Sequence, residues 1–276
     1  MHPAFASSGA PVPIWFATSD NYAQVREQLP LSGRRFAEAA KFEPKAGQFL
    51  LLPGADGSLG GVLFGLEPAG KPDKDRFLPG RLPGLLPAGN YRFANAPHDI
   101  RLAALSFGLG SYKFTRYRKA EQNGVQLELP DGIDGAELSR ITQGTDLARD
   151  LINTPANDMG PAELEEAAKA LSAKHGAIVR TITGEGLLKQ NFPLIHAVGR
   201  ASPRAPRLID LTWGDAAHRK ITLVGKGVCF DTGGLDIKPD AGMLIMKKDM
   251  GGRLRRKSRS RPPGSVRAVE LSASRP

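Results

Sequence analysis

Strand-like runs alternate with helical segments along this chain, and that alternation limits its fold more than any other feature. In the second half the runs are Ala177–Thr183, Arg207–Thr212 and Lys220–Gly225, which are β-branched or leucine-rich. The helix predicted before them begins at Pro161, a favoured first helical position. Such runs are typical of a buried, largely parallel sheet with helices between its strands. The second half therefore predicts a mixed α/β domain.

The first half shows the same alternation on a smaller scale. Its predicted strands are Pro13–Thr18, Gly47–Leu52, Leu59–Leu66, Tyr91–Ala94 and Val125–Leu129. The pair Asp56-Gly57 is a turn signal, so the second and third of these strands should form a hairpin. Helices are expected after Ser19-Asp20 and over Asp99–Leu109. We predict a smaller α/β domain here.

Length and helix periodicity together predict where the chain divides. Its 276 residues are enough for two domains. From Asp134 to Ile152 the apolar residues follow helical spacing, and Pro155 ends this helix. We place the boundary before the helix, which gives an N-terminal α/β domain at residues 1–133 and part of a second domain at 134–252. Residues 253–276 form a third segment of different composition.

The basic charge of the chain is concentrated in that last segment. Residues 253–276 hold eight Lys or Arg and one acid, which accounts for +7 of the formal net charge of +10. Like charge without an apolar pattern over Arg253–Pro263 predicts a disordered basic tail. An alternative function follows from it: a non-catalytic protein that binds nucleic acid nonspecifically through phosphates, in a salt-sensitive way. We regard nucleic acid as the less favoured partner.

Cysteine use and hydropathy predict the compartment. Cys229 is the single cysteine, which excludes an internal disulfide framework and fits a reducing environment. No apolar run reaches the length needed to cross a bilayer. The first nineteen residues carry no Lys or Arg and are interrupted by Pro11 and Pro13, unlike a secretory signal. We expect a cytoplasmic protein without a membrane partner.

Charge and glycine are combined in the span from Lys226 to Asp249, which contains four lysines and four aspartates. Lys226 and Asp231 follow a predicted strand at its carboxyl end, where open α/β sheets hold their ligands. Gly233-Gly234 permits close backbone approach there. Buried aspartates that converge repel one another unless a cation compensates them. The pattern favours a site for a hard or borderline cation; a salt-bridged surface loop is the alternative.

This span closely resembles the leucyl aminopeptidase (cytosol aminopeptidase) family of dinuclear metallo-exopeptidases. The matching residues are Lys226, Asp231 five residues later, Lys238, and Asp249 eleven residues after that. The resemblance implies that Lys226 is a neutral metal ligand, that Asp231 bridges two metals and that Asp249 is a further ligand. It implies that Lys238 polarises the scissile carbonyl. Upstream, Leu147–Asn157 resembles the helix between the family's two domains and the loop after it.

The same resemblance implies an activity and its requirements. Members release N-terminal amino acids from peptides with two divalent metals, Mn or Zn and in some cases Mg, and intact members form homohexamers. The family's Asn-Thr-Asp-Ala-Glu-Gly-Arg motif is absent from this sequence. Three of five side-chain ligands remain, so we expect at most one weak metal site and absent or very low activity. We also expect exposed apolar surface, as in a C-terminally truncated form.

Other residue types give weaker signals. Five scattered histidines form no His-Glu-x-x-His pair, so none is assigned as a ligand. Cys229 lies between Lys226 and Asp231 and is interpreted as a small buried hydrophobic residue. Gly225-Lys226-Gly227 lacks the Ser or Thr and the earlier glycine of a phosphate loop. These signals leave the Lys226–Asp249 span as the candidate site.

Overall fold

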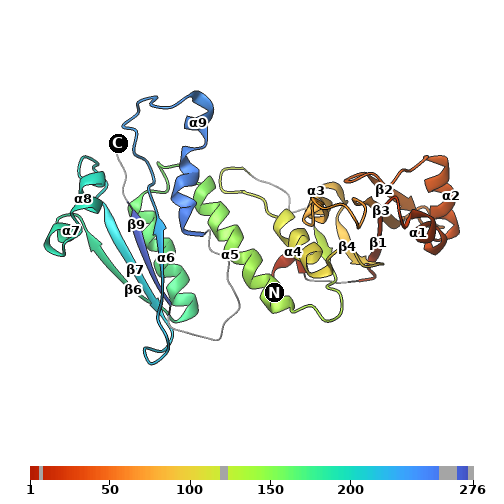
Figure 1. Ribbon diagram of the computed structural model, residues 1–276, viewed down its shortest axis with the longest axis horizontal. Helices are drawn as coiled ribbons and strands as arrows, with labels where there is room; N and C mark the ends of the chain where they lie inside the picture. Colours follow the sequence, from red (N-terminus) through yellow and green to blue (C-terminus); the bar gives the residue numbers. More distant parts are fainter. Residues whose placement is uncertain (6–8, 119–123, 255–265, 273–276) are drawn as a thin grey trace. The chain divides into compact units, whose positions relative to one another are not determined.

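A computed structural model describes residues 1–5, 9–118, 124–254 and 266–272. The chain divides into two compact units, Met1–Asp146 and Leu147–Pro276. This division lies inside the long helix α5 (Gly135–Asn153), whereas the predicted boundary lies just before that helix. The boundaries at residues 133 and 252 remain predictions. Each unit is a mixed α/β structure, so the predicted fold class is confirmed (Figure 1). The largely parallel sheet predicted for the second half is not found among its described strands, where one of three pairings is parallel.

The first unit is built on a five-stranded, mostly parallel sheet of order β2-β3-β1-β4-β5. Its strands are β1 (Val12–Ala17), β2 (Phe49–Pro53), β3 (Leu59–Gly65), β4 (Gly89–Phe93) and β5 (Val125–Leu127). Strand β1 pairs in parallel with β3 and β4, and β4 pairs in parallel with β5. The predicted hairpin is confirmed, because β2 runs antiparallel to β3.

Helices cover this sheet and enclose an aromatic core. They are α1 (Tyr22–Gln28), α2 (Leu31–Ala39), α3 (Leu82–Leu85) and α4 (Ile100–Gly110), with short 3-10 turns η1 (Pro3–Phe5) and η2 (Leu78–Arg81). The carboxylate of Asp99 accepts a hydrogen bond from the Leu102 amide at 2.9 Å and thereby caps α4. Phe16, Phe64 and Tyr91 are fully buried in the main core. Burial of such side chains is the main stabilising contribution to this unit.

His2 has a structural role that the sequence did not indicate. The residue is 8% exposed, and its backbone amide donates to Ser139 Oγ at 3.0 Å. Ring nitrogen Nδ1 accepts from the Ala4 amide, while Nε2 lies 3.1 Å from Asp146 Oδ2. An Nδ1 that accepts leaves Nε2 as the donor, so the ring fits as a neutral group. His2 therefore fixes the start of the chain to α5.

The second unit contains a mixed four-stranded sheet of order β6-β7-β9-β8. Its strands are β6 (Ile178–Thr183), β7 (Arg207–Trp213), β8 (Ile221–Lys226) and β9 (Val266–Ser272). Strand β8 is parallel to β9, whereas β6–β7 and β7–β9 are antiparallel. The helical elements after α5 are α6 (Pro161–His175), α7 (Gly186–Lys189), α8 (Pro193–Gly199), α9 (Asp240–Leu244) and the 3-10 segment η3 (Met246–Leu254). As predicted, α6 begins at Pro161.

Strand β9 differs from the disorder predicted for the tail. Residues 266–272 pair with β7 on one side and with β8 on the other. Their sequence, Val-Arg-Ala-Val-Glu-Leu-Ser, contains an apolar alternation typical of a strand. The disorder prediction was based on the charged Arg-Ser-Pro run that precedes residues 266–272, and it gave no weight to this pattern. Residues 255–265 and 273–276 of the predicted tail lie outside the described residues.

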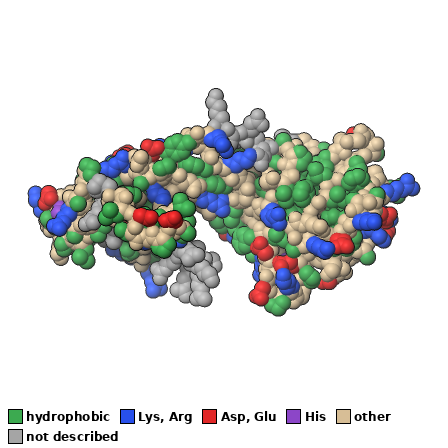
Figure 2. All heavy atoms as spheres, turned by 90° about the horizontal axis from the view of Figure 1, so that it is seen from above, with side chains coloured by type: hydrophobic (Ala, Val, Ile, Leu, Met, Phe, Trp, Pro, Cys, Tyr) green, Lys and Arg blue, Asp and Glu red, His purple; other side chains and the backbone are tan. Residues whose placement is uncertain are grey.

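Apolar surface is exposed on the second unit, as the sequence predicted. Val224 of β8 is 69% exposed and Leu194 of α8 is 80% exposed. A groove with a volume of about 340 Å³ runs between these two elements, and its lining includes Ile195 and Val198. Figure 2 shows apolar side chains, in green, at the molecular surface. In the part of the chain that the structure describes, no helix is long and apolar enough to span a membrane.

A charged cluster joins α6 to β7 within this unit. The Glu165 carboxylate, which is 10% exposed, forms ion pairs with Arg207 and, at 2.8 Å, with Lys169. Burial alone would raise the pKa of Glu165, but the hydrogen bonds from Lys169 and Arg207 outweigh it and hold the pKa below its ordinary value. The ionised carboxylate is therefore the form that the fold stabilises.

We predict that Glu165→Gln lowers the unfolding free energy by about 2–3 kcal/mol at pH 7, because it removes the nearly buried charge that pairs with both Arg207 and Lys169. A lowered folded-state pKa contributes stability above the unfolded value and loses it as pH falls through the folded pKa. The difference between wild type and variant should thus shrink below about pH 4.5, the ordinary carboxyl value. Urea unfolding followed by Trp213 fluorescence, in a Trp15→Phe background, measures the unfolding free energy of each protein.

Glu166→Gln is the matched control, because Glu166 is 70% exposed and pairs with the same Lys169. Its effect should be below about 0.5 kcal/mol at every pH. Equal losses in the two variants would contradict the role given to burial.

Candidate metal centre

Two of the four predicted site residues come from β8 and the loop that follows it. Lys226 is the last residue of β8, and Asp231 lies five residues further on. A tight turn follows, in which the Gly234 amide donates to Thr232 Oγ1 at 3.2 Å. Gly233 and Gly234 have φ values of 63° and 84°, which glycine adopts without strain. The two glycines therefore let the chain reverse directly beside Asp231.

Asp249 reaches the same place from η3. Its Oδ2 lies 3.2 Å from Lys226 Nζ, so residues 23 positions apart form an ion pair. The side chains are 53% exposed for Lys226 and 41% exposed for Asp249. Water therefore reaches both groups, and their Coulomb attraction is weak.

A pocket of about 220 Å³ brings three of the predicted residues together, namely Lys226, Asp231 and Asp249. Its other lining residues are Pro155, Ala156, Val228, Cys229, Phe230, Thr232, Met243, Leu244, Met246 and Lys247. Lys238 is not among them. It is an exposed residue before α9, and its stem lies close to Gly242. The role proposed for Lys238 remains a prediction.

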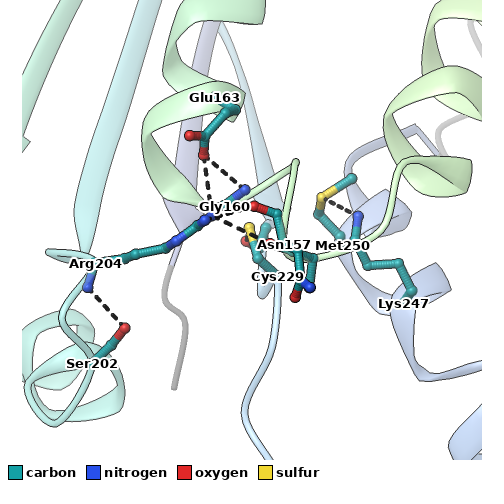
Figure 3. A network of polar contacts seen from close by, with 10 residues as sticks. Asn157, Gly160, Glu163, Ser202, Arg204, Cys229, Lys247 and Met250 are labelled. Atoms are coloured by element: carbon teal, nitrogen blue, oxygen red, sulfur yellow. Dashed lines mark hydrogen bonds and ion pairs between the residues drawn. The ribbon is translucent and has the colours of Figure 1, made fainter. Parts of the chain in front are cut away.

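One wall of the pocket is the loop between α5 and α6, which Arg204 holds in place (Figure 3). The Arg204 guanidinium donates to the carbonyl of Asn157 at 2.6 Å and to that of Ala156 at 3.3 Å. It also lies 3.4 Å from the Glu163 carboxylate, which accepts from the Gly160 amide at 2.9 Å. The Arg204 guanidinium thus satisfies carbonyls of the loop that carries Pro155 and Ala156 to the pocket.

Beneath the pocket lies a small apolar cluster of the second unit. Cys229 and Met250 are 3% and 4% exposed and pack with Met159 and Leu164. Cys229 is therefore a buried hydrophobic residue, as predicted. Burial lowers the pKa of the nearby Lys247 amine below its ordinary value, an effect that Cys229 partly opposes.

The donor set limits what metal this pocket can hold. Among the residues that the structure describes, no group of three or more His, Cys, Asp or Glu side chains is placed to hold a metal ion. Two carboxylates and one amine fit a single divalent cation, with water completing its coordination. Lys226 already contacts one of these carboxylates, that of Asp249, and an amine binds a metal only in its neutral form.

Sequence reasoning missed two residues of this site, Arg204 and Lys247. Arg204 stands in a proline-rich loop far from the motif, and nothing in its neighbourhood indicates a contact with residues 156–157. Lys247 has an identical neighbour, Lys248, and only the structure shows that Lys247 is the more buried of the two. Met246, directly before Lys247, and Met250, three residues after it, are a weak signal for local packing.

Comparison with known proteins identifies the family. Residues 12–130 match the M17 aminopeptidase N-terminal domain, and residues 146–254 match the cytosol aminopeptidase family catalytic domain. The fold is a mixed α/β framework like that of the solved cytosol aminopeptidase it matches. The chain belongs to the M17 cytosol aminopeptidase family, a family of metal-dependent peptidases that act on peptides.

Individual relatives agree with this assignment. The crystal structure of the cytosol aminopeptidase from Coxiella burnetii is 35% identical, with a TM-score of 0.84 over 99% of this chain and 60% of that chain. A protein of Corynebacterium efficiens described as "Probable cytosol aminopeptidase" is 35% identical over 79% of this chain and 46% of its own. The bottromycin maturation enzyme BotP in complex with Mn is 26% identical, with a TM-score of 0.71 over 96% of this chain and 61% of that chain.

The matches also show how much of its relatives' length this chain covers. This chain spans between 33% and 46% of the length of the first curated relatives it matches.

The nucleic-acid hypothesis rests on Arg253–Arg261, of which residues 255–261 lie outside the described part of the chain.

We predict that Asp249→Asn weakens Mn²⁺ binding about tenfold or more, because it removes one of two carboxylates from the pocket. Isothermal titration with Mn²⁺ measures the affinity of both proteins. Asp240→Asn is the control, because Asp240 is exposed and does not line the pocket. An Asp249→Asn variant that binds Mn²⁺ as tightly as the wild type would show that the cation binds elsewhere.

Proposed function

We propose that this chain carries the N-terminal domain and the first part of the catalytic domain of a metal-dependent aminopeptidase that releases N-terminal amino acids from peptides. The observation that supports it is the convergence of Lys226, Asp231 and Asp249 on one pocket, in a chain that belongs to the M17 family. We further propose a cytoplasmic location, in line with the cytosolic names of the relatives.

Each residue has a proposed task. Lys226, Asp231 and Asp249 would hold the cation, with Lys226 acting as a neutral amine. Mn or Zn supplies Lewis-acid chemistry and a nucleophile near neutral pH when bound to such a site. Lys238, as a cation, would offset the negative charge that grows on the scissile carbonyl oxygen. The loop that Arg204 holds would form the wall against which the peptide lies.

The proposal includes a reason for low activity. The family's second metal needs ligands beyond Asp231, and among the described residues Cys229, which is buried, is the only His, Cys, Asp or Glu besides Asp231 and Asp249 that lines the pocket. A single exposed cation leaves no second site for the substrate amine. We propose that this chain alone is inactive or nearly so, and that two metals act only where the absent motif is present.

Hydrolysis of leucine p-nitroanilide by this chain should stay at background with Mn²⁺, Zn²⁺ or Mg²⁺, because the site is incomplete. A chimera tests the framework. The C-terminal part of the Coxiella burnetii relative, joined after Gly252, should restore turnover.

In that chimera, Asp231→Asn should abolish turnover and Lys238→Ala should lower it by about a hundredfold or more. Robust hydrolysis by the chain alone, lost on Lys238→Ala, would refute the inactivity. A folded, metal-loaded chimera without turnover would refute the aminopeptidase assignment.

A further inference from the structure

Lys247 makes two contacts that no other lysine of the site makes. Its Nζ donates to the carbonyl of Leu151 at 3.1 Å and lies 3.0 Å from Met250 Sδ (Figure 3 shows the second contact). The side chain lines the same pocket as Asp249, two residues further along η3. Lys247 is thus in the site without belonging to the motif that the sequence identified.

The contact with Leu151 is at a place where a cation is favourable. Leu151 lies in the last turn of α5, which ends at Asn153. Carbonyls in a last turn lack partners within the helix and carry the negative end of its dipole. A half-buried ammonium there satisfies an acceptor and is itself compensated. The amine therefore joins the segment of Asp249 to the end of a helix.

Two neighbours fix the other side of Asp249. Met250 is buried in the cluster with Cys229 and Met159. At Gly251, an added Cβ would lie 2.3 Å from Ile152 Cδ1, so the backbone packs directly on α5. Asp249 thus lies between an apolar anchor that follows it and a polar anchor, Lys247, that precedes it. An anchor on one side alone would leave the carboxylate free to turn with the chain.

We propose that Lys247 is a positioning residue of the metal centre: by holding η3 on the Leu151 carbonyl it orients Asp249 toward Lys226 and Asp231. This inference rests on the proposed function for the presence of a metal ion, whereas the contacts that position Asp249 do not depend on it. The adjacent Lys248 is exposed, and it has no part in the arrangement.

The test compares Lys247→Met, Lys247→Arg and the matched control Lys248→Met in the full chain. Isothermal titration with Mn²⁺ measures affinity, and hydrogen exchange of residues 246–251 in the metal-free protein measures local order. Lys247→Met should weaken Mn²⁺ binding about tenfold, the range for residues that orient a ligand, and should speed the exchange of this segment. Lys247→Arg, which can still donate to Leu151, should restore most of both properties, and Lys248→Met should change neither.

The two readouts separate the possible failures. Unchanged exchange and unchanged affinity in Lys247→Met would overturn the positioning role and leave the proposed function intact. Faster exchange in Lys247→Met, in a protein whose wild type binds no Mn²⁺, would support the positioning of Asp249 and overturn the proposed metal site. Equal effects of Lys248→Met and Lys247→Met would show a general charge effect and overturn the inference.

Discussion

The site of the second unit depends on the close approach of Gly251 to Ile152, where an added Cβ would lie 2.3 Å from Ile152 Cδ1. This approach allows η3 to pack on the end of α5, with Met250 buried beside Cys229. Asp249, one residue before Met250, is thereby carried to Lys226, although 23 residues separate them in sequence. A larger residue at position 251 would require the Ile152 side chain to shift.

Charge then limits what this packing can achieve. The pocket gathers two carboxylates and two lysines, and its charged groups are partly open to water. Under the proposed function, such a balance would hold a cation weakly, because the lysines compete with the metal for the two carboxylates. The same unit exposes apolar residues of β8 and α8.

The sequence predicted those parts of the fold that local patterns determine. The β2–β3 hairpin followed from Asp56-Gly57, and the start of α6 from Pro161. The spacing of Lys226, Asp231 and Asp249 indicated residues that the structure does gather at one pocket. Arg204 and Lys247 could not be found in this way, because their roles depend on carbonyls of distant residues. Strand β9 was missed for a different reason: charge in the preceding run outweighed its alternation.

The central claim is that this chain holds one cation, at the pocket of Lys226, Asp231 and Asp249, and no pair. Crystals soaked in Mn²⁺ and measured at the manganese absorption edge test it most directly, because anomalous scattering locates each ion without reference to any activity. The account predicts one peak of partial occupancy, bounded by these three side chains. Two peaks of full occupancy about 3.5–4 Å apart, the separation of paired metals in such enzymes, would contradict it.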